Sequence, residues 1–434
     1  MKKTLPLSLL IATVLTACGG MEKAPLKGKR IDISVGYQKL MADPMARKVE
    51  MDFPEAVVNG SWPQSGGVAS HYIGHLDIAA SVNKSWSSGI GGGGDDIRVL
   101  LNTPVVGGKT LYVMNTDQEV VAMESKTGRR MWRKELELKE EEAGELSGGL
   151  ALSDEGLFAT TGSGEVFALN SKTGETKWTV NLSVPLRAAP TVSDGLVFVV
   201  GHNNSLYALS AEDGALVWTH NGLEESIGII GGAAVAVADG VVVVPYSSGE
   251  IYALRVKDGR YLWHDALSIN VGGDAYSSLV DVEAMPVIAD GIVYAVNHNG
   301  RLSTFDLHSG RRLWGVEISA TQMPWVAGNS LFILSDQGQL VAMNRKDGAI
   351  RWVLNMKQGL PKKERDEKTY WSGPVLAGNR LIVVSNLGYA FSVNPTLGEI
   401  KKRVDMGKEL GIAPVVANKR LYFMTENGKI ISYR

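Results

Sequence analysis

The chain has 434 residues with a formal net charge of −2 at pH 7, and 44% of its residues are hydrophobic. So small a charge gives no electrostatic case for binding to nucleic acid, which needs a basic stripe. The composition fits one large globular domain, and the 50 glycines are typical of a β-rich chain with many turns.

The chain begins with the features of a secretory signal. A basic start, Met1-Lys2-Lys3, precedes an apolar stretch at residues 5–14 that is too short to span a bilayer. The stretch ends in Leu15-Thr16-Ala17-Cys18-Gly19, which resembles the lipobox of bacterial lipoproteins. We therefore expect residues 1–17 to be a signal peptide and Cys18 to be lipidated; the alternative is an ordinary signal peptide with an incidental cysteine.

Cysteine usage favours the lipoprotein interpretation. Cys18 is the only cysteine of the sequence, so no structural disulfide is available and its thiol stands where a lipobox requires it. Several acyl chains would anchor the protein permanently. An Asp directly after the lipidated cysteine would resemble a signal for retention in the inner membrane, but the residue here is Gly19. We therefore expect sorting to the outer membrane, with the protein on its periplasmic face.

Between the lipidation site and the repeats, two segments are expected. Residues 18–60 are rich in Lys, Met, Gly and Pro and are predicted to be a tether, with a short added strand at Ile31–Val35. The domain itself is predicted to occupy residues 61–434. Just before its repeats stands Asn83-Lys84-Ser85-Trp86, a β-like segment with a tryptophan that no repeat claims.

The rest of the chain is a repeat of about 40 to 50 residues, a period typical of stacked supersecondary units. Each unit contains short β-branched runs bounded by Gly, Asp and Asn, and ends in a closing glycine. The closing glycines are Gly128, Gly174, Gly214, Gly259, Gly310, Gly348 and Gly398. Four residues after each of the first six stands a tryptophan: Trp132, Trp178, Trp218, Trp263, Trp314 and Trp352. In the seventh unit Lys402 takes this position.

An eighth unit starts at Pro414, but the chain stops before its tryptophan strand. The sequence therefore predicts an all-β fold, an eight-bladed β-propeller of four-stranded antiparallel blades. The last blade would be closed by the N-terminal strand with Trp86, which leaves no open edge. We expect Trp86 and the six repeat tryptophans to dock neighbouring blades, because a large ring buries much area at a junction.

No catalytic constellation is found. His71 and His75 lack the helical pattern and the intervening Glu of a zinc site, and Asp95-Asp96 suits a flexible loop better than a Ca²⁺ site. Ser163 lacks the spacing of a hydrolase elbow. We therefore expect no enzyme activity, no metal and no cofactor.

The tryptophan-docked repeat resembles the propellers of the pyrroloquinoline quinone dehydrogenases, but a neighbouring cysteine pair is impossible here. A lipoprotein signal joined to such a propeller resembles the BamB family of outer-membrane protein assembly factors. The resemblance covers about residues 30–434, and Trp62-Pro63-Gln64, Gly66-Gly67 and His71 resemble its α-proteobacterial branch.

This resemblance implies a scaffold that binds the periplasmic POTRA domains of BamA and assists insertion of β-barrel proteins. Other implied partners are the further lipoproteins of the assembly machinery and unfolded outer-membrane clients. Two inter-blade loops of the family carry partner-binding positions, and they match two segments here. The first is Val184-Pro185-Leu186-Arg187 and the second is Asp281-Val282-Glu283, in which Val184 and Glu283 depart conservatively from the family pattern.

Both segments precede the proline of an inner strand, so they are expected on the same face of the ring. The contact set is thus predicted to be Val184, Leu186, Arg187, Asp281 and Glu283. Two other classes of function stay open: a quinone- or small-ligand-binding envelope propeller that uses the central channel, and an adhesion or polysaccharide-binding propeller.

Overall fold

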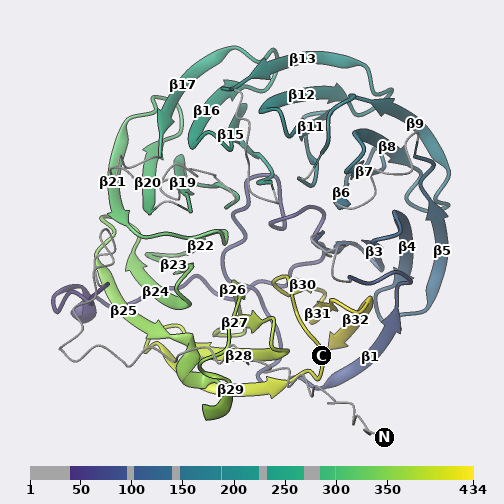
Figure 1. Cartoon of the computed structure of the whole chain (residues 1–434). Helices are drawn as coiled ribbons and strands as arrows, with labels where there is room; N and C mark the ends of the chain where they lie inside the picture. The colour runs from purple at the N-terminus through teal and green to yellow at the C-terminus, as the bar shows by residue number, and fades with distance from the viewer. Residues whose placement is uncertain are drawn as a thin grey trace, which may run out of the picture. The chain divides into compact units, whose positions relative to one another are not determined.

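The computed structural model describes residues 40–94, 102–138, 147–186, 188–223, 232–267, 284–298 and 300–434. They belong to one compact unit, Tyr37–Arg434, whose strands form eight separate four-stranded sheets. The sheets stand side by side as blades around a central axis (Figure 1). The eight-bladed propeller predicted from the repeat is therefore confirmed.

The strands are given blade by blade, from the inner to the outer edge. Blade 1 contains β2 (Val105–Gly107), β3 (Thr110–Met114), β4 (Glu119–Glu124) and β5 (Arg130–Glu135), and blade 2 contains β6 (Ser147–Leu152), β7 (Leu157–Thr161), β8 (Glu165–Leu169) and β9 (Thr176–Asn181). Blade 3 contains β10 (Thr191–Ser193), β11 (Leu196–Val200), β12 (Ser205–Ser210) and β13 (Leu216–Asn221), and blade 4 contains β14 (Ala236–Ala238), β15 (Val241–Pro245), β16 (Glu250–Arg255) and β17 (Tyr261–Ala266). Blade 5 contains β18 (Val287–Ala289), β19 (Ile292–Val296), β20 (Arg301–Asp306) and β21 (Arg312–Glu317), and blade 6 contains β22 (Trp325–Ala327), β23 (Ser330–Leu334), β24 (Gln339–Asn344) and β25 (Ile350–Asn355). Blade 7 contains β26 (Trp371–Ala377), β27 (Arg380–Ser385), β28 (Tyr389–Asn394) and β29 (Glu399–Asp405), and blade 8 contains β30 (Val415–Ala417), β31 (Arg420–Thr425), β32 (Lys429–Tyr433) and β1 (Lys84–Gly89). The described residues also include the 3₁₀ helices η1 (Ala46–Lys48), η3 (Met356–Gly359) and η4 (Lys362–Glu364).

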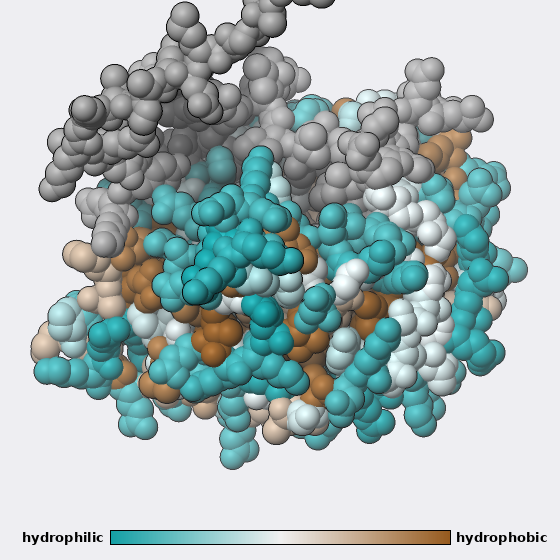
Figure 2. Space-filling model, turned by 60° about the horizontal axis from the view of Figure 1, so that its bottom comes forward, coloured by the Kyte–Doolittle hydropathy of each residue, from teal (hydrophilic) through white to brown (hydrophobic). Residues whose placement is uncertain are grey.

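Burial follows the position of a strand within its blade. The middle strands are buried on both faces, whereas outer strands such as β5 alternate between exposed and half-buried residues. In Figure 2, which brings the bottom of Figure 1 forward, hydrophilic side chains cover most of the surface and leave apolar patches between them. The β-branched runs of the sequence therefore form the cores between neighbouring blades, such as the cluster of Phe158, Val166 and Val197.

The tight turns inside the blades use residues that tolerate positive φ. In the turn between β10 and β11, Asp194 has φ 53° and Gly195 has φ 73°. Two successive residues in this region match the hairpin turn whose twist suits antiparallel strands. The Asp-Gly pair is thus the local reason why these strands fold back on each other.

The seven tryptophans lie between neighbouring blades. Each ring packs against the closing glycine of the next blade, where an added Cβ would lie closer than 3.0 Å to the ring. Each indole N–H donates to the carbonyl oxygen three residues before that glycine, at 2.7–3.3 Å. The glycines are therefore needed for the close approach of the rings as well as for their positive φ.

Blade 8 is closed by the N-terminal strand, as predicted. β1 pairs antiparallel with β32, and Trp86 lies opposite Ser432. Trp86 then docks on blade 1, where its N–H donates to the carbonyl oxygen of Ser125. The last strand of the chain thus has no free edge.

Residues 57–78, here called the girdle, form a feature that the sequence analysis did not anticipate. They run once around the axis on the inner side of the blades, visible as the purple segment at the centre of Figure 1. The girdle forms hydrogen bonds to the inner strand or adjoining turn of every blade, from blade 8 through blades 1 to 7: Asn59 with Val416 and Asn418, Trp62 with Val106, Pro63 with Leu152, Gln64 with Val192, Ala69 with Val237, Ser70 with Ile288, Gly74 with Trp325, and Leu76 with Leu376 and Gly378. It therefore satisfies inner-edge backbone groups that no neighbouring strand pairs.

Residues 40–56 also contact the propeller. Arg351 is 2% exposed and donates from Nη1 to the carbonyl oxygens of Val49 and Glu50. Phe53 packs beside Phe332, with ring centroids 5.9 Å apart. The docked chain thus begins before residue 60, within the segment predicted to be only a tether. The predicted strand at Ile31–Val35 lies outside the described residues.

Candidate functional site

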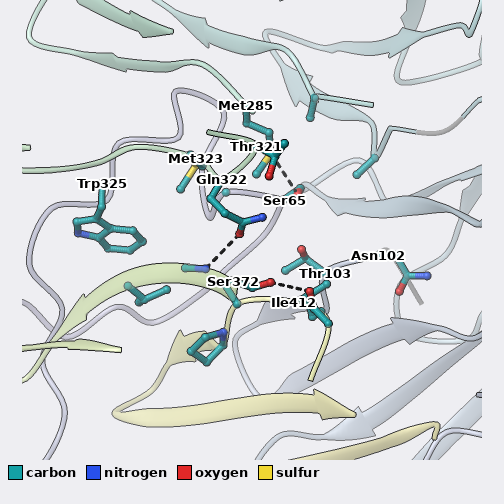
Figure 3. A pocket seen from close by; sticks show the side chains of 18 of the residues that line it. Ser65, Asn102, Thr103, Met285, Thr321, Gln322, Met323, Trp325, Ser372 and Ile412 are labelled. Carbon is teal, nitrogen blue, oxygen red and sulfur yellow. Dashed lines mark hydrogen bonds between the residues drawn. The ribbon is translucent and has the colours of Figure 1, made fainter. Parts of the chain in front are cut away.

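A cavity of about 290 Å³ lies at the axis of the propeller. It is lined by the starts of inner strands and the connectors before them, together with girdle residues Trp62, Ser65 and Gly66. We call this cavity the central cup. Figure 3 shows Met285, Thr321 and Gln322 on one side of it and Asn102 and Thr103 on another.

The described side chains that line the central cup carry no charge. The described residues that line it include Asn, Gln, Ser and Thr beside Met, Trp and Pro, and none of them is acidic or basic. Several polar groups are used internally: Gln322 accepts from the backbone N–H of Gly373 at 3.2 Å, and Ser372 donates to the carbonyl oxygen of Gly411 at 2.7 Å. Such a wall can hold a neutral molecule but offers no general acid or base.

The first predicted partner loop connects β9 to β10. Leu186 forms a bridge to Gly201, and the backbone N–H of His202 donates to the carbonyl oxygen of Pro185 at 2.9 Å. Pro185 is exposed and Val184 is half-buried. The loop is thus pinned to blade 3 and presents Pro185 at the surface.

Leu186 requires a correction. Its sequence context predicts a surface contact, but its side chain is 0% exposed and packs in the core between blades 2 and 3. The reason is the bridge to Gly201, which holds Leu186 against blade 3 while Pro185 beside it is exposed. Arg187, Asp281 and Glu283 lie outside the described residues, as do Cys18 and Asp95-Asp96.

The two histidines considered for zinc have structural contacts instead. His71 Nδ1 lies 2.7 Å from the carbonyl oxygen of Pro286, and His75 Nδ1 lies 2.9 Å from that of Pro54. Within the described ranges, no cluster of three or more His, Cys, Asp or Glu side chains could hold a metal ion. The same ranges contain no helix that is both long and apolar enough to cross a membrane.

His71 should make the fold sensitive to acid. It is 2% exposed, and burial lowers its pKa to about 4, although the contact with Pro286 opposes the shift. The unfolded chain binds a proton below pH about 6.5, whereas the folded chain does so only below pH about 4. Hence stability present above pH 6.5 is lost as the pH falls toward 4, by up to about 3 kcal/mol.

Denaturant unfolding of the wild type and His71→Asn at pH 7.5 and 4.5 checks this expectation. Asn tolerates the positive φ of this position, which is 59°. The variant should be less stable at pH 7.5, and the difference from wild type should shrink at pH 4.5. A difference that does not change with pH would contradict it.

Comparison with known proteins gives a consistent set of relatives. A family model described as outer membrane protein assembly factor BamB matches residues 116–354. The factor of that name from Yersinia pestis is 28% identical over 362 residues, which cover 81% of this chain and 89% of the relative. The one from Moranella endobia is 26% identical over 357 residues, which cover 80% and 89%.

Solved structures show the same fold. The crystal structure of BamB from Moraxella catarrhalis matches with a TM-score of 0.70 at 22% identity, covering 82% of this chain and 100% of that chain. Quinohemoprotein alcohol dehydrogenase from Comamonas testosteroni matches with a TM-score of 0.67 at 15% identity, covering 89% and 82%. At these identities the structural match establishes the fold alone.

Proposed function

Because the chain belongs to the family of outer membrane protein assembly factors BamB, we propose that it is a lipid-anchored scaffold of the β-barrel assembly machinery. In this role it binds the POTRA domains of BamA on the periplasmic side of the outer membrane and performs no catalysis. The observation that carries the proposal is the match to the family model over residues 116–354. A relative that is 28% identical over 81% of the chain supports it.

The geometry of the first loop supports a docking role. Residues 184–186 follow β9 where the chain passes to blade 3, and buried Leu186 and the His202–Pro185 hydrogen bond hold them in place. A pre-ordered loop loses little conformational freedom on binding. Arg187 follows directly, and arginine is a frequent anchor of protein interfaces. The proposed contacts are therefore Val184, Pro185 and Arg187, with Asp281 and Glu283 from the second loop.

Arg187→Ala tests the proposed binding. Truncation of an arginine anchor typically costs about 2 kcal/mol, or roughly thirtyfold in affinity. We expect that loss for a purified POTRA-containing fragment of BamA, measured by calorimetry, with the melting temperature of the propeller nearly unchanged.

Two variants control this measurement. Lys172→Ala changes an exposed residue in the turn between β8 and β9, at the opposite end of β9, and should bind normally. Leu186→Ala should lower stability by about 2 to 5 kcal/mol, because it empties a buried site. If Arg187→Ala and Lys172→Ala bind alike, or if Arg187→Ala unfolds as Leu186→Ala does, the partner site lies elsewhere.

Cys18→Ala tests the proposed anchor. The variant should fold normally but leave the membrane fraction, since acyl chains contribute roughly 0.8 kcal/mol per buried methylene and no other anchor is proposed. Fractionation of cell envelopes after a high-salt wash measures this outcome. A variant that stays with the membrane would refute the proposed lipidation.

The fold neighbours raise quinone binding as a second candidate, but the central cup does not fit it. An anionic quinone cofactor needs cationic partners, and a Ca²⁺ beside it needs carboxylate oxygens. None of the described residues that line the cup carries either charge. The cysteine pair expected under the quinone is also impossible with one cysteine. We therefore route no step of the proposed function through a cofactor.

A further inference from the structure

The junction between blades 7 and 8 breaks the docking rule of the other seven. Lys402 stands opposite Ser392 in the register where Trp352 stands opposite Ala342 in blade 6. The position four residues before Trp86, which holds the closing glycine in the other blades, is Val82. Both halves of the tryptophan–glycine contact are thus absent at the seam where the ring closes.

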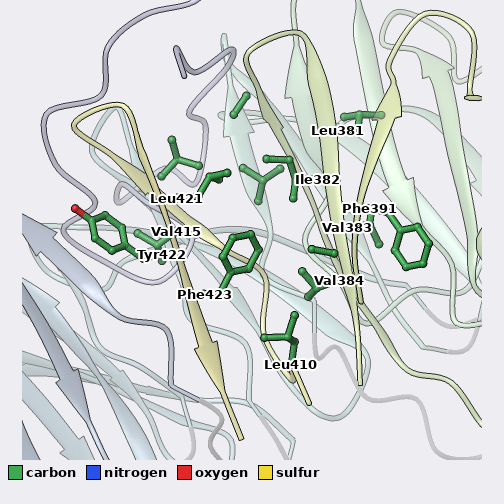
Figure 4. Packing of buried hydrophobic residues seen from close by; sticks show 14 of the residues in the cluster. Leu381, Ile382, Val383, Val384, Phe391, Leu410, Val415, Leu421, Tyr422 and Phe423 are labelled. Atoms are coloured by element: carbon green, nitrogen blue, oxygen red, sulfur yellow. The ribbon is translucent and has the colours of Figure 1, made fainter. Parts of the chain in front are cut away.

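A cavity of about 100 Å³ occupies this junction. We call it the seam cavity. Its lining includes Lys402 and Ser392 and the apolar side chains Ile382, Leu421 and Phe423. Figure 4 shows Leu421 and Phe423 on β31 and Ile382 on β27, where the two blades face each other. Ile382 is the third residue of β27. In β31 the third residue is Tyr422, whose ring lies beside docked Trp86 with the centroids 6.0 Å apart.

Two cations lie in the lining of the seam cavity. Lys402 is exposed, and it forms no ion pair or hydrogen bond within the described part of the chain. Arg380 donates to the carbonyl oxygens of Ala79 and Ala80, but its buried Nε has no partner among the described residues. Burial also lowers the pKa of Arg380.

We propose that the seam cavity binds an aromatic side chain of a partner polypeptide that carries a carboxylate next to the ring. At the seven occupied junctions an indole fills the space beside a closing glycine; at the seam Val82 takes the place of that glycine, so the cavity has room for only part of a ring. The two cations favour an acidic neighbour. A cavity of about 150 Å³ in another protein encloses benzene. The seam cavity, at about 100 Å³, can enclose only part of an aromatic side chain. This inference is independent of the proposed function, because the segments proposed to bind POTRA domains follow blades 2 and 4 in the sequence.

N-acetyltryptophan is the probe, with N-acetyltryptophanamide as its uncharged match and N-acetylalanine as the match without a ring. In a ligand-detected NMR titration, the wild type should bind the acid with a dissociation constant of the order of 1 mM. The amide lacks the carboxylate and should bind up to about fivefold more weakly, because an exposed ion pair contributes at most about 1 kcal/mol. Lys402→Gln should reduce this preference for the acid.

A rebuilt junction provides the decisive control. The double variant Val82→Gly/Lys402→Trp restores the tryptophan–glycine contact from within the chain and should abolish binding of both indole probes. Ser392→Leu fills the same space from β28 and should do so independently. Lys401→Trp adds an indole to the neighbouring exposed position and should leave binding unchanged.

The outcomes separate clearly. Loss of binding in the filled variants, with retention in Lys401→Trp, supports the site. Absence of binding to the wild type, equal binding of N-acetylalanine, or unchanged binding to a folded filled variant would each overturn it. None of these outcomes depends on whether Arg187 contacts a POTRA domain.

Discussion

Deletion of residues 40–79, with β1 retained, should abolish the cooperative unfolding transition of the propeller. The deletion removes the girdle, and with it Trp62, Leu76 and Ile78, which are 3%, 1% and 4% exposed. Loss of one large buried side chain typically costs about 2 to 5 kcal/mol, and a whole domain is stable by only about 5 to 15 kcal/mol. The inner strands would also lose their partners at the axis.

Thermal unfolding followed by circular dichroism measures this effect. A matched deletion of residues 19–39, the predicted tether, should leave the transition near its wild-type temperature. If both deletion variants melt alike, the girdle is a passive covering and does not hold the ring together.

Trp263→Ala should lower the free energy of unfolding by about 3 to 5 kcal/mol. Trp263 is 5% exposed, its N–H donates to the carbonyl oxygen of Leu307 at 2.7 Å, and its ring lies on Gly310. Truncation would therefore open a cavity between blades 4 and 5 and leave a carbonyl group without its partner.

Leu262→Ala is the matched control for this substitution. Leu262 is the preceding residue of β17 and is 37% exposed, so its truncation should change stability by only about 0.5 kcal/mol. Urea denaturation of both variants gives the comparison. Equal losses would contradict the docking role of Trp263.

The blades could be predicted because their signals are local and repeated. A closing glycine and a tryptophan four residues later specify a turn and a packing contact in six of the units, and the structure has both as expected. Closure by β1 could be predicted because Trp86 was the tryptophan left over when the eighth unit lacked its own. Repetition thus reveals the long-range pairing between the two ends of the propeller.

The girdle could not be predicted in this way. Its residues have neither the alternation of a strand nor the period of a helix, because its hydrogen bonds pass from one blade to the next and use side chains as well as backbone groups. Signals were present in Gly66 and Gly67, whose φ values are 71° and 91°, and in His71 at 59°. They indicate tight turns but not the eight partners of the segment.

The burial of Leu186 could not be predicted for a related reason. A family pattern places Leu186 in a contact loop, but the bridge to Gly201 joins two connectors of the propeller and depends on how the loops meet. The replacement of tryptophan by Lys402 was visible in the sequence, whereas its coupling to Val82 and to the seam cavity required the register of β28, β29 and β1.

Purification of the intact, lipidated protein from detergent-solubilised envelopes tests the central claim most directly. Mass spectrometry of the co-purifying proteins should identify a POTRA-containing outer-membrane barrel protein together with other lipoproteins of the assembly machinery, and the Arg187→Ala protein should recover less of them. Recovery of the intact protein without any POTRA-containing partner would contradict the account.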